Sequence, residues 1–463
     1  MDSEKLNKIL EGMPFVLNEG QLNFLYKYIS GAGHNLLIGE AGSGKSAILT
    51  ILKQYYKDEM VFCASTGVAN QNLLDGKGGE GTAHRVFSLT LKMGDEIARK
   101  KVSRPCSALF SGSDLIKHVV VDEFFMLNPE HLDIILDRVN RFNKRTSKRK
   151  QRNIRLLMVG DCLQIPPVIS DKDKTYLRKE YGSHLTFDSK PWDRLQPELS
   201  VLTEVMRQGD KTFKACLEVL RYGQEHRYDG VLQWLNKRVN YNYDRNLFTV
   251  ATYNKTVESV NLRVLNSNHN PKIEFKAKIK GKFSLKENNI EESITLCEGL
   301  ECITTSNHKD GDFSNGSFCI IKQVSIDGCY CYFPHNDSEL FVELKEYEQT
   351  ESYVMKDVAQ QDGSVKDVLK KDIIGTCRQI PLMQASAFSC HRSQGRTFDK
   401  EGVLDMGYGF REDNDFGQSL LYTGVSRFTD VNLIHLPRPL KKEHIKVCRR
   451  SVEFYKKCLK ENL

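Results

Sequence analysis

The sequence predicts an α/β protein with two domains of parallel sheet and a small β insert in the second domain. Short apolar runs with β-branched residues stand at 35–38, 60–65, 118–122 and 154–161, with helical spacing between them. Runs of this kind are typical of strands that are buried on both faces. A second series follows at 200–205, 247–252, 401–406 and 431–436. Because strands alternate with helices, each series predicts βαβ units in a domain of its own.

The insert is predicted between Pro271 and about Thr376. There the sequence changes to short alternating segments such as "FCIIKQV", "CYCYFP" and "ELFVEL", which turn residues separate. Closely spaced hairpins without helical spacing are typical of a small β-barrel. The charged segment at 345–367 is expected to form a mobile loop of this insert.

These changes of pattern set the expected boundaries. We expect a first domain at 1–197, a second domain at 198–272 and 376–440, the insert at 273–375 and a basic C-terminal helix at 441–463. Within the first domain, "NPEHLDIILDRVNRF" predicts a helix for which Asn128 offers the N-cap.

Composition indicates an intracellular, soluble protein. Hydrophobic residues make up 40% and charged residues 27% of the 463 positions, as in ordinary globular proteins. No stretch approaches the roughly 20 apolar residues that span a bilayer, and the N-terminus lacks a signal pattern. The thirteen cysteines are expected to stay reduced. The net charge of +7 is concentrated at 144–152 and 438–460, which suits a polyanionic partner or a nuclear import signal, or else a solvated surface.

The segment "GEAGSGKS" at 39–46 predicts a phosphate-binding loop. Its glycines, lysine and serine fit the spacing G-x-x-x-x-G-K-[ST], in which backbone N–H groups face phosphates. An apolar run precedes the loop and a helical pattern follows it, so the loop stands at a helix N-terminus that favours anions. The residues expected to bind the nucleotide here are Gly39, Glu40, Ala41, Gly42, Ser43, Gly44, Lys45 and Ser46.

Two carboxylates argue that the nucleotide is hydrolysed. Asp122 and Glu123 follow the apolar run "VVV", at the edge of the sheet where the phosphate loop also opens. Asp122 can hold Mg²⁺, and Glu123 can deprotonate the attacking water. The next predicted strand ends in "GDCLQIPPV", where the amide of Gln164 can sense the γ-phosphate or hold the lytic water.

Taken in order, "LNEGQ", "GEAGSGKS", "CASTGVAN", "GTAHRVF", "VVVDEFFM", "GDCLQIPPV", "LTEVMRQ", "HRSQGRTFD" and "LLYTGVSR" resemble the motifs of superfamily 1B helicases. The likeness is greatest to the petite-integration-frequency (Pif) family, with RecD and the phage Dda helicase as more distant relatives. It runs from about Leu17 to Pro437. The resemblance implies two RecA-like P-loop domains and an SH3-like insert. It also implies a wedge for duplex DNA at about 89–112.

The resemblance also assigns roles in ATP hydrolysis with Mg²⁺. Gln21 would read the adenine edge, and Arg207 and Arg427 would act as arginine fingers from the second domain. Gln394 and Gly395 would link the nucleotide to DNA. The remaining roles fall on Lys45 for the β and γ phosphates, Ser46 with Asp122 for Mg²⁺, Glu123 as base and Gln164 as γ-phosphate sensor.

For the DNA strand, the resemblance implies phosphate contacts from several motifs. Phe87 would stack on a base or belong to the core. The expected contacts are Thr66, His84, Asn254, His391 and Ser393. Departures from the family pattern occur at Arg396, Gly424 and Val425, and none of them removes a catalytic group.

The function so implied is an ATP-dependent DNA helicase that moves 5′→3′ on single-stranded DNA and unwinds duplexes in replication, repair or recombination. The expected partners are single-stranded and forked DNA and replication or recombination proteins. We expect a monomer without membrane attachment, in the nucleus or wherever the DNA is replicated. The chain is similar to accessory helicases of phages and large DNA viruses. Two alternatives stay open, an RNA-directed helicase and a catalytically silent nucleic-acid-binding protein of the same fold.

Overall fold

The computed structural model divides the chain into two compact units, 1–257 with 388–463, and 258–387. It describes residues 3–40, 42–66, 69–70, 73–74, 80–90, 92–111, 116–144, 153–167, 169–204, 210–245, 247–283, 285, 290–308, 311–313, 317–334, 336–359, 365–394, 398–411, 415 and 417–462. At 104–105, 108, 111, 349–359 and 365–372 it describes the backbone alone.

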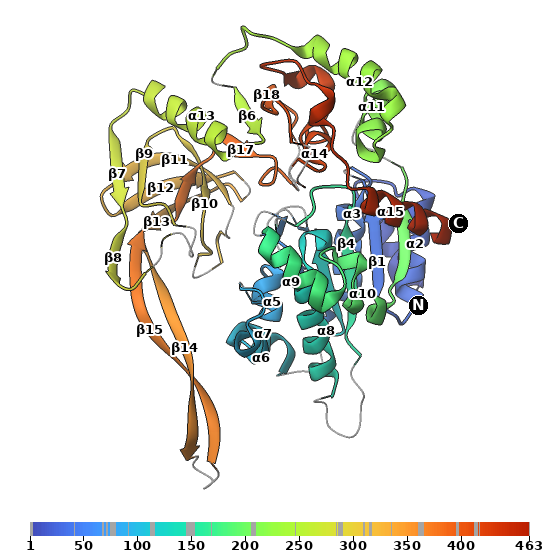
Figure 1. Ribbon diagram of the computed structural model, residues 1–463, viewed down its shortest axis with the longest axis vertical. Coiled ribbons are helices and arrows are strands. Elements are labelled where there is room, and N and C mark those ends of the chain that lie inside the picture. The colour runs from blue at the N-terminus through green and yellow to red at the C-terminus, as the bar shows by residue number, and fades with distance from the viewer. Residues whose placement is uncertain are drawn as a thin grey trace. The chain divides into compact units, whose positions relative to one another are not determined.

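The first half of the larger unit is a parallel sheet with the strand order β2-β3-β4-β1-β5 (Figure 1). Its strands are β1 (Asn35–Gly39), β2 (Met60–Ala64), β3 (His118–Asp122), β4 (Arg155–Gly160) and β5 (Glu198–Leu202). Its helices are α1 (Ser3–Glu11), α2 (Glu19–Ser30), α3 (Lys45–Tyr56), α5 (Ala83–Phe87), α6 (Glu96–Lys100), α7 (Arg104–Ser111), α8 (Pro129–Lys144), α9 (Asp171–Tyr181) and α10 (Lys190–Leu195).

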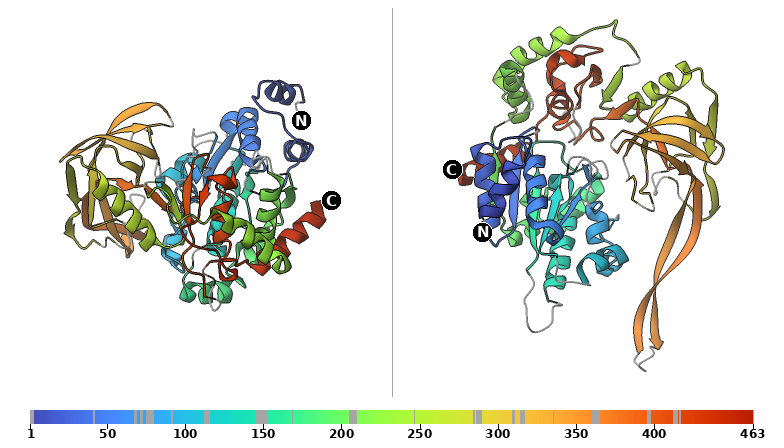
Figure 2. Two further views of the ribbon diagram at one scale, coloured as in Figure 1. Left: turned by 90° about the horizontal axis from the view of Figure 1, so that it is seen from above. Right: turned by 180° about the vertical axis from the view of Figure 1, so that it is seen from behind.

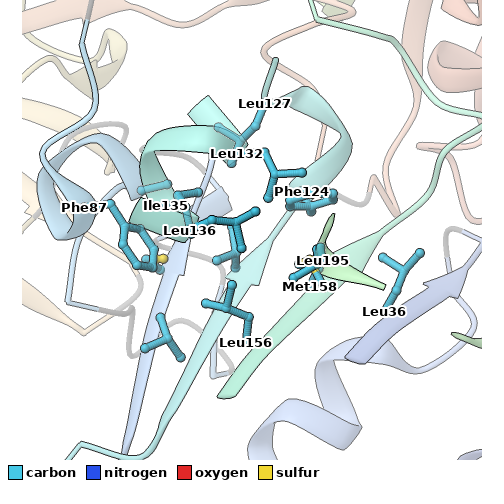
Figure 3. Packing of buried hydrophobic residues seen from close by; sticks show 14 of the residues in the cluster. Leu36, Phe87, Phe124, Leu127, Leu132, Ile135, Leu136, Leu156, Met158 and Leu195 are labelled. Carbon is cyan, nitrogen blue, oxygen red and sulfur yellow. The ribbon is translucent and has the colours of Figure 1, made fainter. Parts of the chain in front are cut away.

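Alternate residues of each strand fill two cores, one on either face of this sheet. On one face Leu36 and Met158 pack with residues of α5, α8 and α10, as Figure 3 shows. On the other face Leu37 and Val159 pack with residues of α1, α2 and α3. The four apolar runs of the first series are therefore strands of one buried parallel sheet, as predicted. Asn128 also accepts the backbone N–H of His131 at 3.0 Å and caps α8.

The strand β5 corrects one expectation. We expected the run at 200–205 to belong to the second sheet, but β5 pairs in parallel with β1, with Leu37 opposite Ser200. Helix α15 (Arg449–Asn462) contacts β5, and its residue Phe454 stacks on Phe187 with a ring distance of 4.5 Å. The C-terminal helix therefore completes the core of the first half.

The second half contains a sheet with the strand order β17-β6-β18-β19. Strands β6, β18 and β19 run in parallel and correspond to three runs of the predicted second series. The strands are β6 (Phe248–Ala251), β17 (Ala387–Ser389), β18 (Gly402–Asp405) and β19 (Ile434–His435). The helices are α11 (Lys211–Tyr222), α12 (Tyr228–Leu235), α13 (Asn254–Ser267) and α14 (Leu420–Val425).

The smaller unit consists mainly of β-strands, in agreement with the hairpins that were predicted for the insert (Figure 2). Its core is formed by residues such as Leu296, Cys319 and Phe333. The SH3-like class of this unit stays a prediction. The strands are β7 (Lys272–Lys276), β8 (Lys278–Gly281), β9 (Ser293–Cys297), β10 (Glu301–Thr304), β11 (Phe318–Ser325), β12 (Gly328–Phe333), β13 (Ser338–Glu343), β14 (Lys345–Ala359), β15 (Val365–Gln379) and β16 (Leu382–Gln384).

The prediction of a mobile loop at 345–367 is wrong for most of this segment. Its residues 345–359 form β14, which pairs with β15 in antiparallel register from Lys345 opposite Gln379 to Ala359 opposite Val365. The two strands form the long ribbon in Figure 1. The segment carries many charged residues, and such a composition does not distinguish this strand from a loop.

Candidate active site

The phosphate loop lies where predicted, between β1 and α3. Gly42 and Gly44 have φ angles of +86° and +82°, which other residues adopt only with strain. Lys45 is the first residue of α3, and its Nζ donates to the carbonyls of Gly39 and Glu40, both at 2.8 Å. The ammonium group is thereby held over the loop. Ala41 lies outside the described residues.

Gln21 packs against this loop. It belongs to a capping box in which its side-chain oxygen accepts the N–H of Asn18 at 2.9 Å. Its Nε2 donates to the carbonyl of Ser43 at 2.9 Å. A Cβ atom at Gly44 would lie 2.1 Å from this Nε2, so the glycine is required for the contact. Gln21 therefore lies beside the phosphate loop, and its reading of adenine stays a prediction.

The two predicted carboxylates lie at the carboxyl end of β3. Oδ1 of Asp122 accepts the N–H of Glu123 at 2.9 Å, and Glu123 has a left-handed φ of +49°. Burial raises the pKa of Glu123 to about 7, and the charge of Asp122 contributes to the rise. Lys45 and Arg427 oppose that rise in pKa. A base with a pKa near neutrality suits the removal of a proton from water.

The end of β4 brings Gln164 to the same edge. A Cβ atom at Gly160 would lie 3.1 Å from the ring of Phe125 and 3.7 Å from the Cα of Glu123, so the glycine allows the two strand ends to approach. Nε2 of Gln164 donates to Asp161 at 3.3 Å. Its Oε1 is buried and has no hydrogen-bond partner among the described residues.

The second half contributes Arg427, which is 2% exposed. Its Nε donates to the carbonyl of Thr423 at 3.1 Å, and its Nη2 donates to the hydroxyl of Ser426 at 3.0 Å. Burial lowers the pKa of Arg427, and the charge of Glu123 opposes this. The charges of Arg427 in the second half and Glu123 in the first half therefore influence each other's pKa values. Arg207 lies outside the described residues.

Gln394 is buried in the second half, and neither polar atom of its amide has a hydrogen-bond partner in the described part of the chain. A buried amide without partners is costly, which fits a role in contacting a bound group. Gly395 lies outside the described residues.

Two of the residues that were expected to contact DNA are buried. Phe87 is fully buried, stacks on Phe110 with a ring distance of 6.0 Å and belongs to the core of the first half. Its apolar neighbours on α5, Ala83 and Val86, are buried with it, which favours the core role among the two roles that the sequence left open. Ser393 is also fully buried, and its hydroxyl donates to the carbonyl of Cys390 at 2.8 Å.

The other four expected DNA contacts lie at the protein surface or near it. Asn254 is exposed, and Thr66, His84 and His391 are partly buried. Burial lowers the pKa values of His84 and His391, so both rings are neutral donors and acceptors at neutral pH. Their contacts with a strand stay predictions.

A cavity of about 270 Å³ lies between the two halves of the larger unit. Pro166 and Pro167, which follow Gln164, line it from the first half, and His391 and Gln418 line it from the second. The loop after β4 therefore connects the hydrolysis site to a surface on which a predicted strand contact lies.

Sequence reasoning missed Arg221 and Tyr422, which meet Asp161 in the buried interior. Nη1 of Arg221 donates to Oδ2 of Asp161 at 2.5 Å and to the hydroxyl oxygen of Tyr422 at 2.7 Å. A signal was present, because Arg221 is four positions from Leu217 and eight from Phe213 on α11. That spacing places the arginine on the apolar face of the helix.

Several known proteins are similar in sequence to this chain. The sequence pattern of the PIF1-like helicases matches residues 18–223. The ATP-dependent DNA helicase Pif1 of Campylobacter jejuni is 25% identical over 452 residues, which are 91% of this chain and 94% of the relative. The yeast ATP-dependent DNA helicase RRM3 is 27% identical over 333 residues, which cover 68% of this chain and 43% of the yeast protein.

Among solved structures, the Pif1 helicase from Bacteroides in complex with ADP-AlF₃ and single-stranded DNA has a similar fold. The TM-score is 0.80 at 22% identity, over 96% of this chain and 98% of that one. In its fold, the chain is thus similar to a two-domain helicase over nearly its whole length. None of the described helices is long and apolar enough to cross a membrane.

Proposed function

The chain belongs to the PIF1-like helicases of superfamily 1B, and from this premise we propose that it is an ATP-dependent DNA helicase that moves 5′→3′ along single-stranded DNA. Its DNA partners are single strands and forks, and its protein partners come from replication or recombination. We propose that it acts as a monomer where DNA is replicated.

The observation that carries the proposal is that positive charges from both halves, those of Lys45 and Arg427, act on the carboxyl group of Glu123. Lys45 is the first residue of α3 and Glu123 directly follows β3, both in the first half, whereas Arg427 follows α14 in the second half. Both cations oppose the rise that burial causes in the pKa of Glu123. A phosphate loop with a base is sufficient for hydrolysis, but a cation from a second α/β half is what links hydrolysis to relative movement of the halves.

The residues present fit ATP with Mg²⁺. The left-handed glycines Gly42 and Gly44 orient the loop. The amide oxygen of Gln164 and both polar amide atoms of Gln394 have no hydrogen-bond partner among the described residues and can take partners from a bound group. We propose that Ser46 and Asp122 hold Mg²⁺, which supplies positive charge next to the phosphates when bound. Glu123 takes the proton of the attacking water, and Arg427, together with Arg207, stabilises the charge that develops on the γ-phosphate.

Movement along DNA follows if the halves close on ATP and open after hydrolysis. Each half then holds the strand in turn, with Thr66 and His84 on the first and Asn254 and His391 on the second. The direction does not follow from this local chemistry, because a closing cleft can move either way. We take the 5′→3′ direction from the family.

Unwinding of tailed duplexes tests the function and its direction together. Duplexes with a 5′ single-stranded tail should be separated in the presence of ATP and Mg²⁺, whereas those with a 3′ tail should remain paired. The Lys45→Ala variant is the control for contaminating activity. Unwinding of 3′-tailed duplexes alone would overturn the direction. ATP hydrolysis that RNA oligomers stimulate more than DNA oligomers would instead favour the RNA-directed alternative.

A further inference from the structure

One carboxylate oxygen joins the two halves next to the hydrolysis site. Oδ2 of Asp161 accepts from Nη1 of Arg221 at 2.5 Å, from the hydroxyl of Tyr422 at 3.2 Å and from Nε2 of Gln164 at 3.3 Å. Gln164 and Asp161 follow β4 in the first half, while Arg221 lies on α11 and Tyr422 on α14. Three donors from three elements thus share one acceptor atom. We call these four residues the Asp161 cluster.

The same arginine also reaches the phosphate loop. Nε of Arg221 lies 3.6 Å from a carboxylate oxygen of Glu40, and Glu40 contributes a carbonyl that holds Lys45. The cluster therefore touches the loop and the γ-phosphate sensor on one side. On the other side, α14 ends just before Arg427, so a shift of Tyr422 is transmitted through one short helix to the proposed arginine finger.

Burying the Asp161 cluster costs free energy, because its members are charged or polar. The side chains of Arg221 and Asp161 are both 0% exposed. Yet Nη2 of Arg221 and Oε1 of Gln164 have no hydrogen-bond partners among the residues that the structure describes. An unsatisfied buried polar atom costs about 1–3 kcal/mol, and apolar side chains of similar volume often stabilise a protein as well as a buried ion pair does. Stability alone is therefore a poor reason for this arrangement.

Sharing one oxygen makes the three donors compete. If the amide of Gln164 turns toward another acceptor, Oδ2 of Asp161 becomes available to Arg221 and Tyr422 alone, and their bonds to it strengthen. If Gln164 returns, those bonds weaken. Binding at the sensor is thereby able to change how firmly α11 and α14 are held against the first half.

We propose that Arg221 and Tyr422 are positioning residues that, through Asp161, couple the contact of Gln164 with the γ-phosphate to the placement of α14 and its arginine finger. This inference rests on the proposed function, because it requires a phosphate at Gln164. It goes beyond that function by naming the atoms through which nucleotide state reaches the second half.

The test uses Tyr422→Phe, which removes only the hydroxyl, and Arg221→Lys, which keeps the charge but loses the planar fork that reaches Asp161 and Tyr422 together. Arg138→Lys is the matched control. Arg138 is 4% exposed and donates to the main-chain carbonyls of Phe87, Arg99 and Lys101, none of which belongs to the Asp161 cluster. Thermal midpoints are measured first, and all assays are run below the lowest midpoint.

We expect both test variants to reduce the stimulation of kcat by single-stranded DNA at least fivefold, the lower end of typical couplings between sites. The KM for ATP should change less than the stimulation, and the number of base pairs unwound per ATP should fall. Arg138→Lys should lower the midpoint and leave the stimulation and the base pairs per ATP as in the unmodified protein. A purely structural cluster predicts the same result for all three variants.

A double-mutant cycle between Gln164→Ala and Tyr422→Phe gives a second measurement. Because both residues act through one oxygen, Tyr422→Phe should have little further effect on DNA-stimulated kcat once Gln164 is replaced. Additive effects, or unchanged stimulation in both Tyr422→Phe and Arg221→Lys, would overturn the relay while leaving the helicase intact. An unmodified protein whose ATP hydrolysis DNA does not stimulate would overturn the proposed function, and the relay with it.

Discussion

Burial raises the pKa of the Glu123 carboxyl group in the first half, and the charge of Arg427 in the second half opposes this rise. Arg427 is held by the hydroxyl of Ser426 and the carbonyl of Thr423 in its own segment. Its guanidinium is therefore positioned by the second half and acts on a group of the first. The rate of hydrolysis therefore depends on the position of the second half relative to the first, because that position sets where the guanidinium lies.

Replacing Arg427 with alanine should lower kcat for ATP by about 10³-fold or more, the range found for arginine fingers. The KM for ATP should change much less, because the finger acts mainly on charge that develops in the transition state. Steady-state hydrolysis with saturating single-stranded DNA measures both constants. A large rise in KM with an unchanged kcat would show that Arg427 only helps to bind ATP.

Glu123→Gln should stop hydrolysis and leave nucleotide binding in place. The amide cannot accept the proton of the attacking water, a contribution of about 10²- to 10⁴-fold to the rate, whereas Asp122 keeps its carboxylate. Binding of a fluorescent ATP analogue and single-turnover hydrolysis separate the two effects. If the variant fails to bind nucleotide in the presence of Mg²⁺, Glu123 holds the metal and the roles of the two carboxylates are exchanged.

Lys45→Ala should abolish hydrolysis but not the binding of single-stranded DNA, because the expected strand contacts lie on other elements. Lys53→Ala is the matched control. Lys53 lies on the same helix and forms a weak pair with Glu80 at 3.9 Å. Hydrolysis and the anisotropy of a labelled oligonucleotide are the two readouts. Retained hydrolysis in Lys45→Ala would remove the phosphate loop from the mechanism.

The parts of the fold that the sequence predicted are those with strong local patterns. The runs at β1 to β4 were recognised because strands buried on both faces are apolar throughout. Strand β5 was assigned to the wrong sheet, because its pairing with β1 is a contact between distant segments that no local pattern encodes. The ribbon of β14 and β15 was missed because a local pattern was misleading. Its many charged residues are typical of a loop.

The same division holds for the site. Lys45, Asp122 and Glu123 were predictable because motif spacing and strand ends place them together. The Asp161 cluster was not predictable, because it depends on contacts between α11, α14 and the end of β4, which are far apart in the sequence. The burial of Ser393 was not predictable either. A serine or an arginine is written with the same letter whether its side chain faces solvent or the interior, so the sequence alone does not show its burial.

Stability should depend on pH through His118. Burial lowers the pKa of His118 to about 3 in the folded chain, and the charges of Arg155 and Lys117 contribute. In the unfolded chain the pKa is about 6.5, so the unfolded state binds the proton first as the pH falls. The stabilisation is thus complete above about pH 6.5 and is lost toward pH 3, with a slope of at most about 1.4 kcal/mol per pH unit.

Urea unfolding of the unmodified protein and of His118→Gln at pH 7.5, 6.5 and 5.5 measures this effect. The glutamine variant should be less stable at pH 7.5, because the hydrogen bond between Nδ1 of His118 and the hydroxyl of Tyr28 at 2.9 Å is altered. It should also lose less stability as the pH falls. Equal slopes for the two proteins would show that His118 does not contribute to the pH dependence. His131, with a pKa lowered to about 4, titrates in both proteins and cancels in the comparison.

Substitution of Phe87 distinguishes a role of its ring in the core from a role in binding DNA. The ring is fully buried between α5 and α7, where it stacks on Phe110. Phe87→Ala should therefore lower the free energy of unfolding by about 3–5 kcal/mol, as other large-to-small core substitutions do. Affinity for single-stranded DNA, measured by anisotropy at a temperature where the variant is folded, should stay within a factor of about two. Loss of a base-stacking contact would instead weaken binding by about 1–3 kcal/mol, or roughly 5- to 150-fold, without a large change in stability.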